Sequence, residues 1–355
     1  MKPRLFLFIL LSVVCINGFS QEDPLKKQKR SPENKGQDEQ KLNEKGKAEF
    51  DKAKTDFKNI NNPKFELAAN EIVNEDLQLL VGVPSNEKPD TKLSEKQNED
   101  NKKNQKEIQD KLRKGAKNDK IEINFSPSGN PPVGASSSDA TFWYPEYYTP
   151  VKNQGKCGSC WAFAACAAFE HTTAKLWATK FDLSEQDIVA CGATCNSTDC
   201  GGCNGGWSDK AFDYIKCHGV ASETSYPYTA KSNPCISKAS FKSASTWGQL
   251  LVNGSFPSIE WVKYYLTIYG SLVTYMKAGI STFYSYGYGV YNGYPSTSTN
   301  SVDHAVTLVG WSDDLQAWII KNSWGAGWGG YGGYAYIGYN QCNLAKYVYW
   351  ILPNQ

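Results

Sequence analysis

Between the first residues and residue 120, the pattern of hydrophobic and polar positions indicates three parts of the chain. The first is a short amphipathic helix, indicated by apolar residues that recur at helical spacing among charges: Phe50, Ala53, Phe57 and Ile60. The second is a helical stretch from Leu67 to Leu80, closed by Gly82 and Pro84. The third, from Ser85 to Lys120, is rich in charged and amide residues with few apolar positions, so we expect disorder or a solvated helix.

A long helix and a hairpin are predicted further along the chain. Cys160 to Ala174 is rich in Ala and aromatic residues and contains neither Gly nor Pro, so we expect a helix that begins near Ser159. Ala305 to Trp311 suits a buried strand, and a turn then leads to a second strand in AWIIKNSW, from Ala317 to Trp324. Two strands joined in this way form a hairpin.

The first 20 residues are predicted to be an export signal. A basic start, Met1 to Arg4, precedes twelve uncharged residues, Leu5 to Ile16, and small residues follow at a plausible cleavage site. Twelve apolar residues are too few to span a bilayer, so we expect no membrane anchor. Export implies an oxidising environment in which paired cysteines form disulfides. Three sequons are candidate glycosylation sites on the same route: Asn124, Asn196 and Asn253.

Composition separates a charged N-terminal segment from an aromatic C-terminal one. All 11 Trp and all 21 Tyr lie after residue 135, where 13 Lys stand against 14 Asp and Glu and no Arg occurs. A segment of this size, residues 136–355, can bury a core and is expected to form one domain or two closely packed halves. Its balanced charge offers no footprint for nucleic acid or for an anionic membrane.

Residues 21–135 are predicted to form a removable pro-segment. Its last part overlaps SPSGNPPVGASSS, from Ser126 to Ser138, which is a flexible and protease-accessible linker by composition. The alternative is a tail without consequence. The linker lies where processing would have to occur, which favours the pro-segment.

Two closely spaced cysteines in QGKCGSCWAF, Cys157 and Cys160, are compatible with several kinds of chemistry. Zinc binding together with Cys200 and Cys203 is disfavoured, because 39 residues separate the two pairs and export disfavours a thiolate zinc cage. A redox pair would need a preceding buried strand, whereas YYTPVKNQG is a loop. We therefore predict one structural and one reactive cysteine, with no metal and no cofactor.

Cys160 is the candidate nucleophile, since the start of a helix favours a thiolate. A thiolate nucleophile needs a base, and the chain has only three histidines. His171 lies about three turns further along the same helix, roughly 16 Å away, and His218 ends another helical stretch. His304 remains, and the hairpin places it near Asn322, whose amide oxygen could fix the imidazole.

Four separated motifs resemble those of the papain family of cysteine peptidases, and of its cathepsin L-like members, in the family's order. They are NQGKCGSCWAF, GCNGGW, VDHAVTLVGW and IIKNSWGAGWG. The resemblance covers about Phe142 to Leu352. His304 lies 144 residues after Cys160, within the spacing typical of the family, and Asn322 lies 162 residues after it, which implies insertions in the intervening loops.

The resemblance implies a papain-like two-domain α+β fold, with a helical half that carries Cys160 and a β-barrel-like half that carries His304 and Asn322 across a cleft. It makes Cys160 the nucleophile and His304 its acid–base partner. Asn322 would orient the imidazole and Trp324 would shield that bond from water. Gln154 would donate to the oxyanion together with the Cys160 N–H. The implied reaction is acyl transfer through a thioester.

The resemblance also implies disulfides and a substrate-binding set. The disulfides are Cys157–Cys203 and Cys191–Cys235. Cys195 and Cys200 lie in one short loop and could close on each other, and three cysteines stay unassigned: Cys166, Cys217 and Cys342. The substrate-binding candidates are Gly205, Gly206, Trp207, Ser208, Tyr275, Val302, Asp303, Ala305, Trp324 and Tyr347. The pocket for the second residue before the cut would be lined by six of them: Trp207, Ser208, Tyr275, Val302, Ala305 and Tyr347. That wall is apolar and aromatic without a carboxylate, so we expect it to prefer Val or Leu over a cation.

The predicted pro-segment keeps only part of the family pattern. Phe50, Phe57 and Asn61 fit its helix motif, and a second motif survives only in four positions: Ala68, Asn70, Ile72 and Asn74. An inhibitory pro-segment is still expected.

These features predict a secreted or lysosomal cysteine endopeptidase, made as a zymogen, that acts as a monomer on protein or peptide substrates and is inhibited by its own pro-segment. The alternative is a non-proteolytic secreted binding protein that keeps the fold and uses the Tyr- and Gly-rich surface at Tyr284–Tyr294 and Trp324–Tyr339. The complete set of polar site residues argues against the alternative.

Overall fold

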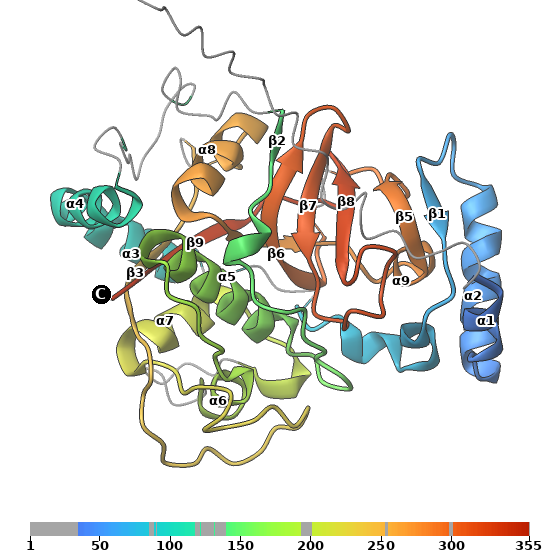
Figure 1. Ribbon diagram of the computed structural model, residues 1–355, viewed down its shortest axis with the longest axis horizontal. Coiled ribbons are helices and arrows are strands. Elements are labelled where there is room, and N and C mark those ends of the chain that lie inside the picture. The colour runs from blue at the N-terminus through green and yellow to red at the C-terminus, as the bar shows by residue number, and fades with distance from the viewer. Residues whose placement is uncertain are drawn as a thin grey trace, which may run out of the picture.

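A computed structural model describes residues 35–84, 89, 91–117, 121, 131, 140–192, 201–252, 255–297 and 301–354. Within these residues, helices α5 to α7 gather at one side of the molecule and most strands of a mixed sheet lie at the other (Figure 1). The predicted α+β class is therefore confirmed.

The helical half is built around α5 (Cys160–Trp177), which matches the predicted helix. Side chains on every face of α5 are buried, and its many Ala residues let neighbouring elements approach closely. α5 packs against β6 and β9 of the sheet and against the other helices of this half. Those elements are α6 (Glu185–Cys191), the 3-10 helix η7 (Gly202–Asn204) and α7 (Ser208–His218).

The sheet has the strand order β1-β5-β8-β7-β6-β4-β9-β3, with β2 paired to β6 outside that path. β5 and β8 are parallel, and the other pairs are antiparallel. The path runs from β1 at one end to β3 at the other, so the sheet is more open than the expected barrel-like half. The strands are β1 (Phe65–Leu67), β2 (Thr141–Phe142), β3 (Ala244–Gln249), β4 (Leu272–Met276), β5 (Tyr286–Tyr291), β6 (His304–Ser312), β7 (Ala317–Lys321), β8 (Tyr334–Gly338) and β9 (Val348–Pro353).

The predicted hairpin is present as β6 and β7, paired from Thr307↔Lys321 to Ser312↔Ala317. Every residue of both strands is buried, which explains their nearly continuous apolar sequence. Three short helices accompany the sheet: η5 (Pro145–Tyr147), α8 (Ile259–Tyr269) and α9 (Ser281–Tyr284).

The predicted amphipathic helix is α2 (Glu44–Lys58), which follows α1 (Lys35–Gln40). It buries Phe50 and Ala53, whereas Ile60 lies beyond its end. In Figure 1, α1 and α2 stand at the end of the sheet where β1 pairs with β5.

The helix predicted from Leu67 to Leu80 is wrong. This stretch contains the end of β1 and two 3-10 helices, η3 (Glu71–Asn74) and η4 (Leu77–Leu80). Its backbone finds partners elsewhere in the fold: Leu67 pairs with Tyr286, and Ala68 N–H donates to Ser285 O at 2.8 Å. Apolar spacing therefore indicated the buried positions, while long-range pairing determined the backbone.

The expectation of disorder or a solvated helix between Ser85 and Lys120 is also wrong for most of that stretch. α3 (Thr91–Lys103) and α4 (Gln105–Ala116) occupy it, and both pack on the rest of the molecule. The buried face of α3 is polar, with Ser94, Gln97, Asn98 and Asn101 on one side of the helix. A stripe of amides does not register as hydrophobic periodicity, which is why the sequence pattern missed it.

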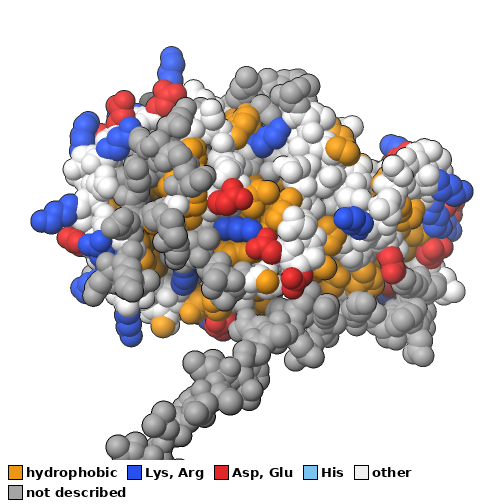
Figure 2. Space-filling view, turned by 90° about the horizontal axis from the view of Figure 1, so that it is seen from above, with side chains coloured by type: hydrophobic (Ala, Val, Ile, Leu, Met, Phe, Trp, Pro, Cys, Tyr) orange, Lys and Arg blue, Asp and Glu red, His pale blue; other side chains and the backbone are white. Residues whose placement is uncertain are grey.

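Several predicted features lie outside the described residues: the export signal, the linker apart from Pro131, the three sequons at Asn124, Asn196 and Asn253, and the cysteines Cys195 and Cys200. Among the helices that are described, none has the length and apolar character needed to cross a membrane. The described charges of both signs are interspersed on the face shown in Figure 2.

Candidate functional site

Cys160 is the first residue of α5, as the sequence predicted. The loop before it is held by the Cys157–Cys203 disulfide and by a hydrogen bond from Gly158 N–H to Cys203 O at 2.9 Å. The Cys160 side chain is fully buried, and the N–H of Ala305, from the opposite half, donates to its sulfur at 3.4 Å. The two halves of the molecule therefore meet at this thiol.

His304 and Asn322 are brought together across the hairpin. His304 begins β6 and Asn322 follows β7, and His304 Nε2 lies 2.8 Å from Asn322 Oδ1. The ring of Trp324 lies 4.7 Å from the imidazole, centroid to centroid, and both rings are buried. The Asn322 oxygen fixes one imidazole nitrogen, while Nδ1 has no hydrogen-bond partner in the described part of the chain.

Gln154 is oriented by Ser323, a residue that the sequence analysis did not single out. Ser323 Oγ donates to Gln154 Oε1 at 2.6 Å, and Ser323 O accepts from Gln154 N–H at 2.8 Å. With its oxygen occupied, the Gln154 side chain directs Nε2 toward Cys157 O at 2.9 Å and Leu80 O at 3.2 Å. The position of Ser323 between Asn322 and Trp324 was the only available sequence signal.

The site contains backbone of the N-terminal segment. The sequence predicted an inhibitory pro-segment but did not indicate which of its residues lie at the site. Trp324 Nε1 donates to Leu80 O at 3.2 Å. Gly206 N–H donates to Gly82 O at 2.9 Å, and Val83 N–H donates to Asp303 O at 3.0 Å. Residues 80–83 thus lie in a cleft with walls from both halves of the molecule.

Glycines make this close approach possible. A Cβ on Gly82 would lie 2.0 Å from Gly158 O, so Gly82 has no room for a side chain. Gly205 has a φ of +110°, and a Cβ there would lie 2.8 Å from Gly82 O. The backbone at Gly82 therefore packs directly on the backbone of the cleft wall, with no space for a side chain between them.

Burial decides the charge state of the site. It raises the pKa of the Cys160 thiol to about 12, against the opposing effect of N–H donors from Ala305, Gly82 and Trp161. It lowers the pKa of His304 to about 4, against the opposing effect of the Asn322 hydrogen bond. The thiolate expected from the helix N-terminus is therefore not favoured in this covered form, because loss of hydration outweighs the helix.

The apolar substrate-binding candidates cluster beside the same backbone. Trp207, Val302, Ala305 and Tyr347 belong with Tyr275 to one buried apolar cluster that also includes Val83. The Trp207 and Tyr275 rings are 5.0 Å apart, and Tyr275 Oη accepts from Ser208 N–H at 2.8 Å. The Asp303 carboxylate is held by Lys277 Nζ at 2.5 Å and by Ala278 N–H at 2.7 Å, so it is engaged outside the pocket.

The other two histidines are placed apart from these groups. His171 is buried on α5, where its Nε2 lies 3.3 Å from both Thr149 N and Lys321 Nζ. His218 ends α7 and packs near Tyr214.

The structure contains both disulfides implied by the resemblance, Cys157–Cys203 and Cys191–Cys235. Cys166 and Cys342 are buried thiols, and Cys217 is exposed near the end of α7. Within the described residues, no group of His, Cys, Asp and Glu has the arrangement needed to hold a metal ion.

A cleft between a helical half and a sheet half, with Cys160 on one wall and His304 on the other, is the arrangement of a papain-like fold. A family model described as papain family cysteine protease matches residues 136–352, and the chain belongs to this family.

Relatives and a solved structure agree with this assignment. A Caenorhabditis elegans protein named cathepsin L-like is 38% identical over 232 residues, which is 63% of this chain and 66% of that protein. Mouse procathepsin L is 38% identical over 206 residues, covering 56% of this chain and 60% of that protein. The chain thus spans less than two thirds of the length of the curated relatives it matches. A structure from work on antibody cross reactivity between the mite allergens Blo t 1 and Der p 1 matches with a TM-score of 0.67 and 26% identity, covering 92% of this chain and 96% of that one.

Proposed function

We propose that the chain is the latent precursor of a cysteine endopeptidase. Cys160 Sγ attacks the carbonyl carbon of an internal peptide bond, His304 takes the thiol proton and passes it to the leaving amine, and a thioester to Cys160 forms. Water that gives a proton to His304 then hydrolyses the thioester. Asn322 holds the imidazole, and Gln154 donates from Nε2 to the oxyanion of each tetrahedral intermediate.

One observation carries this proposal: the cleft already contains a peptide backbone, held by the groups to which the mechanism assigns roles. The carbonyl of Leu80 accepts from Gln154 and from Trp324. Gly82 N–H interacts with the Cys160 thiol, and Gly206 N–H donates a hydrogen bond to the Gly82 carbonyl. These contacts support a site that binds extended peptide next to the thiol.

A thiol-reactive epoxide tests the assignment of the nucleophile. At acidic to neutral pH it should label the acid-activated chain, and it should label neither the uncut chain nor the Cys160→Ala variant. Equal labelling of Cys160→Ala would assign the reactive thiol to another cysteine. A complete lack of label after activation would favour the alternative, a secreted binding protein that keeps the fold.

The zymogen form is the second part of the proposal. Residues 80–83 lie beside Cys160, where a substrate would have to bind, so the pro-segment is its inhibitor. We expect latency until the chain is cut in the linker between Ser126 and Ala140. Full activity of the uncut chain would contradict inhibition by this segment.

The pocket next to the thiol is proposed to accept a modest apolar residue two positions before the cut. Val83 belongs to the apolar cluster of Trp207 and Tyr275, which supports this preference. Burial of an apolar side chain contributes about 1.5–3 kcal/mol, whereas a buried cation without a partner costs several kcal/mol. A peptide library should therefore show Val or Leu at this position. A preference for Arg, or release of terminal dipeptides only, would contradict the proposed specificity and the endopeptidase action.

Location and assembly complete the proposal. The predicted export signal and the disulfides support a secretory route, ending outside the cell or in the lysosome. The enzyme is proposed to act on proteins or peptides as a monomer. Fractionation of expressing cells and sedimentation of the purified chain would test both points.

A further inference from the structure

Strand β3 is the last strand in the order of the sheet, and helix α3 covers its outer edge. β9 lies on the inner side of β3, where Leu250 N–H, just beyond the strand, donates to Val348 O at 2.8 Å. Alternate residues of an antiparallel strand direct their N–H and C=O groups to opposite sides, so Trp247 and Gln249 face outward. Such groups on an edge strand are a template for pairing with another chain.

Two Asn side chains of α3 take the place of a neighbouring strand. Asn98 Nδ2 donates to Gln249 O at 2.9 Å, while Asn98 Oδ1 accepts from Gln249 N–H at 3.2 Å. Asn101 Nδ2 donates to Trp247 O at 2.7 Å. Both Asn residues are buried, and a Cβ on Gly248 would lie 2.8 Å from Asn98 Oδ1. The Asn98 amide thus bonds to Gln249 as a peptide group of an added strand would.

Gln97 extends the same contact to a third element. Its Nε2 donates to Thr246 Oγ1 of β3 at 3.0 Å, and its Oε1 accepts from Lys216 Nζ of α7 at 2.7 Å. α3 is therefore bound to both the sheet edge and the helical half.

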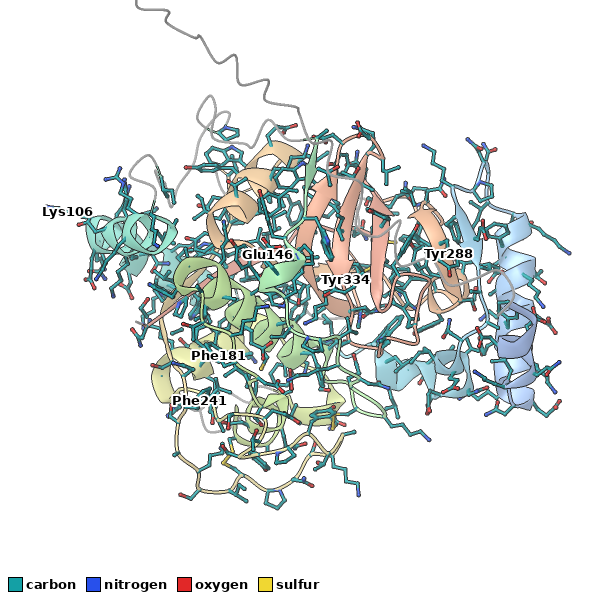
Figure 3. The ribbon with its side chains drawn as sticks, in the orientation of Figure 1. Lys106, Glu146, Phe181, Phe241, Tyr288 and Tyr334 are labelled. Atoms are coloured by element: carbon teal, nitrogen blue, oxygen red, sulfur yellow. A yellow bond between two sulfur atoms is a disulfide. The ribbon has the colours of Figure 1, made fainter. Side chains whose placement is uncertain are left out.

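α4 adds the apolar part of the contact. It buries Ile108 and Leu112, and a Cβ on Gly115 would lie 3.2 Å from Leu176 Cβ of α5. α3 and α4 lie at the opposite end of the molecule from α1, α2 and β1 (Figure 1), and Lys106 marks that end in Figure 3, where Tyr288 of β5 marks the other. The two ends of the pro-segment thus bind to separate surfaces.

We propose that α3 and α4 are a lasting cover for the open edge of the sheet, which the enzyme keeps after the cleft-blocking residues 80–83 have gone. This rests on the proposed function, in which those residues are the inhibitor. The proposed state requires the cut in the linker and a second cut between Val83 and Thr91, which separates residues 80–83 from α3. The two helices are then held by the contacts with β3, α5 and α7. Release of inhibition therefore does not require release of the cover.

The contact with β3 is tested by amide hydrogen exchange in the full chain carrying Cys160→Ala. In the double variant Asn98→Ala/Asn101→Ala, the amide hydrogen of Gln249 should exchange with solvent about tenfold faster or more, because buried backbone groups of β3 lose their partners. Asn104→Ala is the matched control, since Asn104 is exposed and makes no side-chain cap. The double variant should also unfold at a lower temperature than the control. If the exchange rate and the unfolding temperature match those of the control, the proposal is overturned. Slow exchange at Val83 would show that residues 80–83 still bind in the cleft and that the variant is folded.

Retention is tested on the activated chain. Protein labelled at Cys160 by a biotinylated epoxide is captured under native conditions and mapped by mass spectrometry. Peptides from residues 91–117 should be recovered in equal amount with those from residues 140–192, while peptides from residues 44–80 should be lost. Labelled enzyme without residues 91–117 would overturn retention. A lack of label would contradict the peptidase proposal alone. Retention is then decided on the Cys160→Ala chain, which is cut by a second protease and passed through a sizing column to see whether residues 91–117 elute with the rest of the chain.

Discussion

At the residue scale, the orientation of a single amide determines whether the proposed site can stabilise an oxyanion. Ser323 occupies Gln154 Oε1 and so leaves Nε2 facing the cleft. An amide rotated by half a turn would present an oxygen there and repel the developing charge. We therefore propose Ser323 as a positioning residue that acts through Gln154.

A double-mutant cycle tests this role of Ser323. Ser323→Ala should lower kcat roughly threefold to tenfold with little change in KM, the effect of one lost hydrogen bond. Gln154→Ala should lower kcat about a hundredfold or more. The double variant should be no slower than Gln154→Ala alone, because Ser323 has then nothing left to orient. A full additional loss would show that Ser323 acts through another group.

The burial of Cys160 leads to a second prediction at this scale. Because its pKa is raised to about 12 in the covered form, the thiolate fraction there stays small and rises with pH across the neutral and alkaline range. Alkylation of Cys160 in the uncut chain should therefore keep increasing up to pH 10. We expect activation to hydrate the site and to let Cys160 pair with protonated His304, so alkylation should level off and activity should follow a bell in pH. Mass spectrometry of the alkylated Cys160 peptide checks this, and identical profiles before and after activation would contradict it.

At the scale of elements, the cleft-blocking segment depends on a glycine. A Cβ on Gly82 would lie 2.0 Å from the carbonyl oxygen of Gly158, so Gly82→Ala must displace the segment. The uncut Gly82→Ala chain should therefore hydrolyse a peptide substrate, whereas the unchanged chain stays latent. Leu79→Ala is the matched control, since Leu79 lies in η4 of the same segment and is 36% exposed. Equal latency of both variants would show that the inhibitor does not need its close fit at Gly82.

The elements also show what the sequence could and could not predict. His304 and Asn322 were predicted to meet because a hairpin is local, and the position of Cys160 followed from the start of a helix. The path of residues 67–80 could not be predicted from apolar spacing, because their backbone partners lie about 200 residues away, in β5 and the loops near it. The packing of α3 was missed because most of its buried residues are amides, and a buried amide needs a specific hydrogen-bond partner, which the sequence pattern does not identify.

At the scale of the whole molecule, a buried polar group joins the two halves behind the site. Thr149 Oγ1 donates to Glu170 Oε2 of α5 at 2.6 Å and accepts from Lys321 Nζ of β7 at 3.0 Å. Lys321 directly precedes Asn322, so this link is continuous with the proposed catalytic residues. All three side chains are buried, where lost partners are costly.

Thr149→Val should therefore destabilise the chain, because it keeps the shape of the side chain and removes its hydroxyl. The buried Glu170 and Lys321 groups each lose a partner, and the free energy of unfolding should fall by about 2–5 kcal/mol. Urea unfolding of the Cys160→Ala chain measures this change. Thr179→Val is the control, since Thr179 is exposed, and it should change stability by less than about 0.5 kcal/mol. An equal effect of both variants would contradict a link between the halves.

The arrangement of the pro-segment has a further consequence, which concerns concentration. In the chain, the residues in the cleft lie between two anchors: β1, which is one end strand of the sheet, and α3, which is bound to the other end strand, β3. As long as the chain is intact, the proposed inhibitor is present at the cleft at the effective concentration of a tethered ligand, on the order of millimolar for a short linker. When the linker has been cut, a second cut between Val83 and Thr91 would turn that ligand into one with an ordinary dissociation constant. The proposed enzyme would then gain activity on dilution, so the same cleaved molecule would be less active at high concentration than at low concentration.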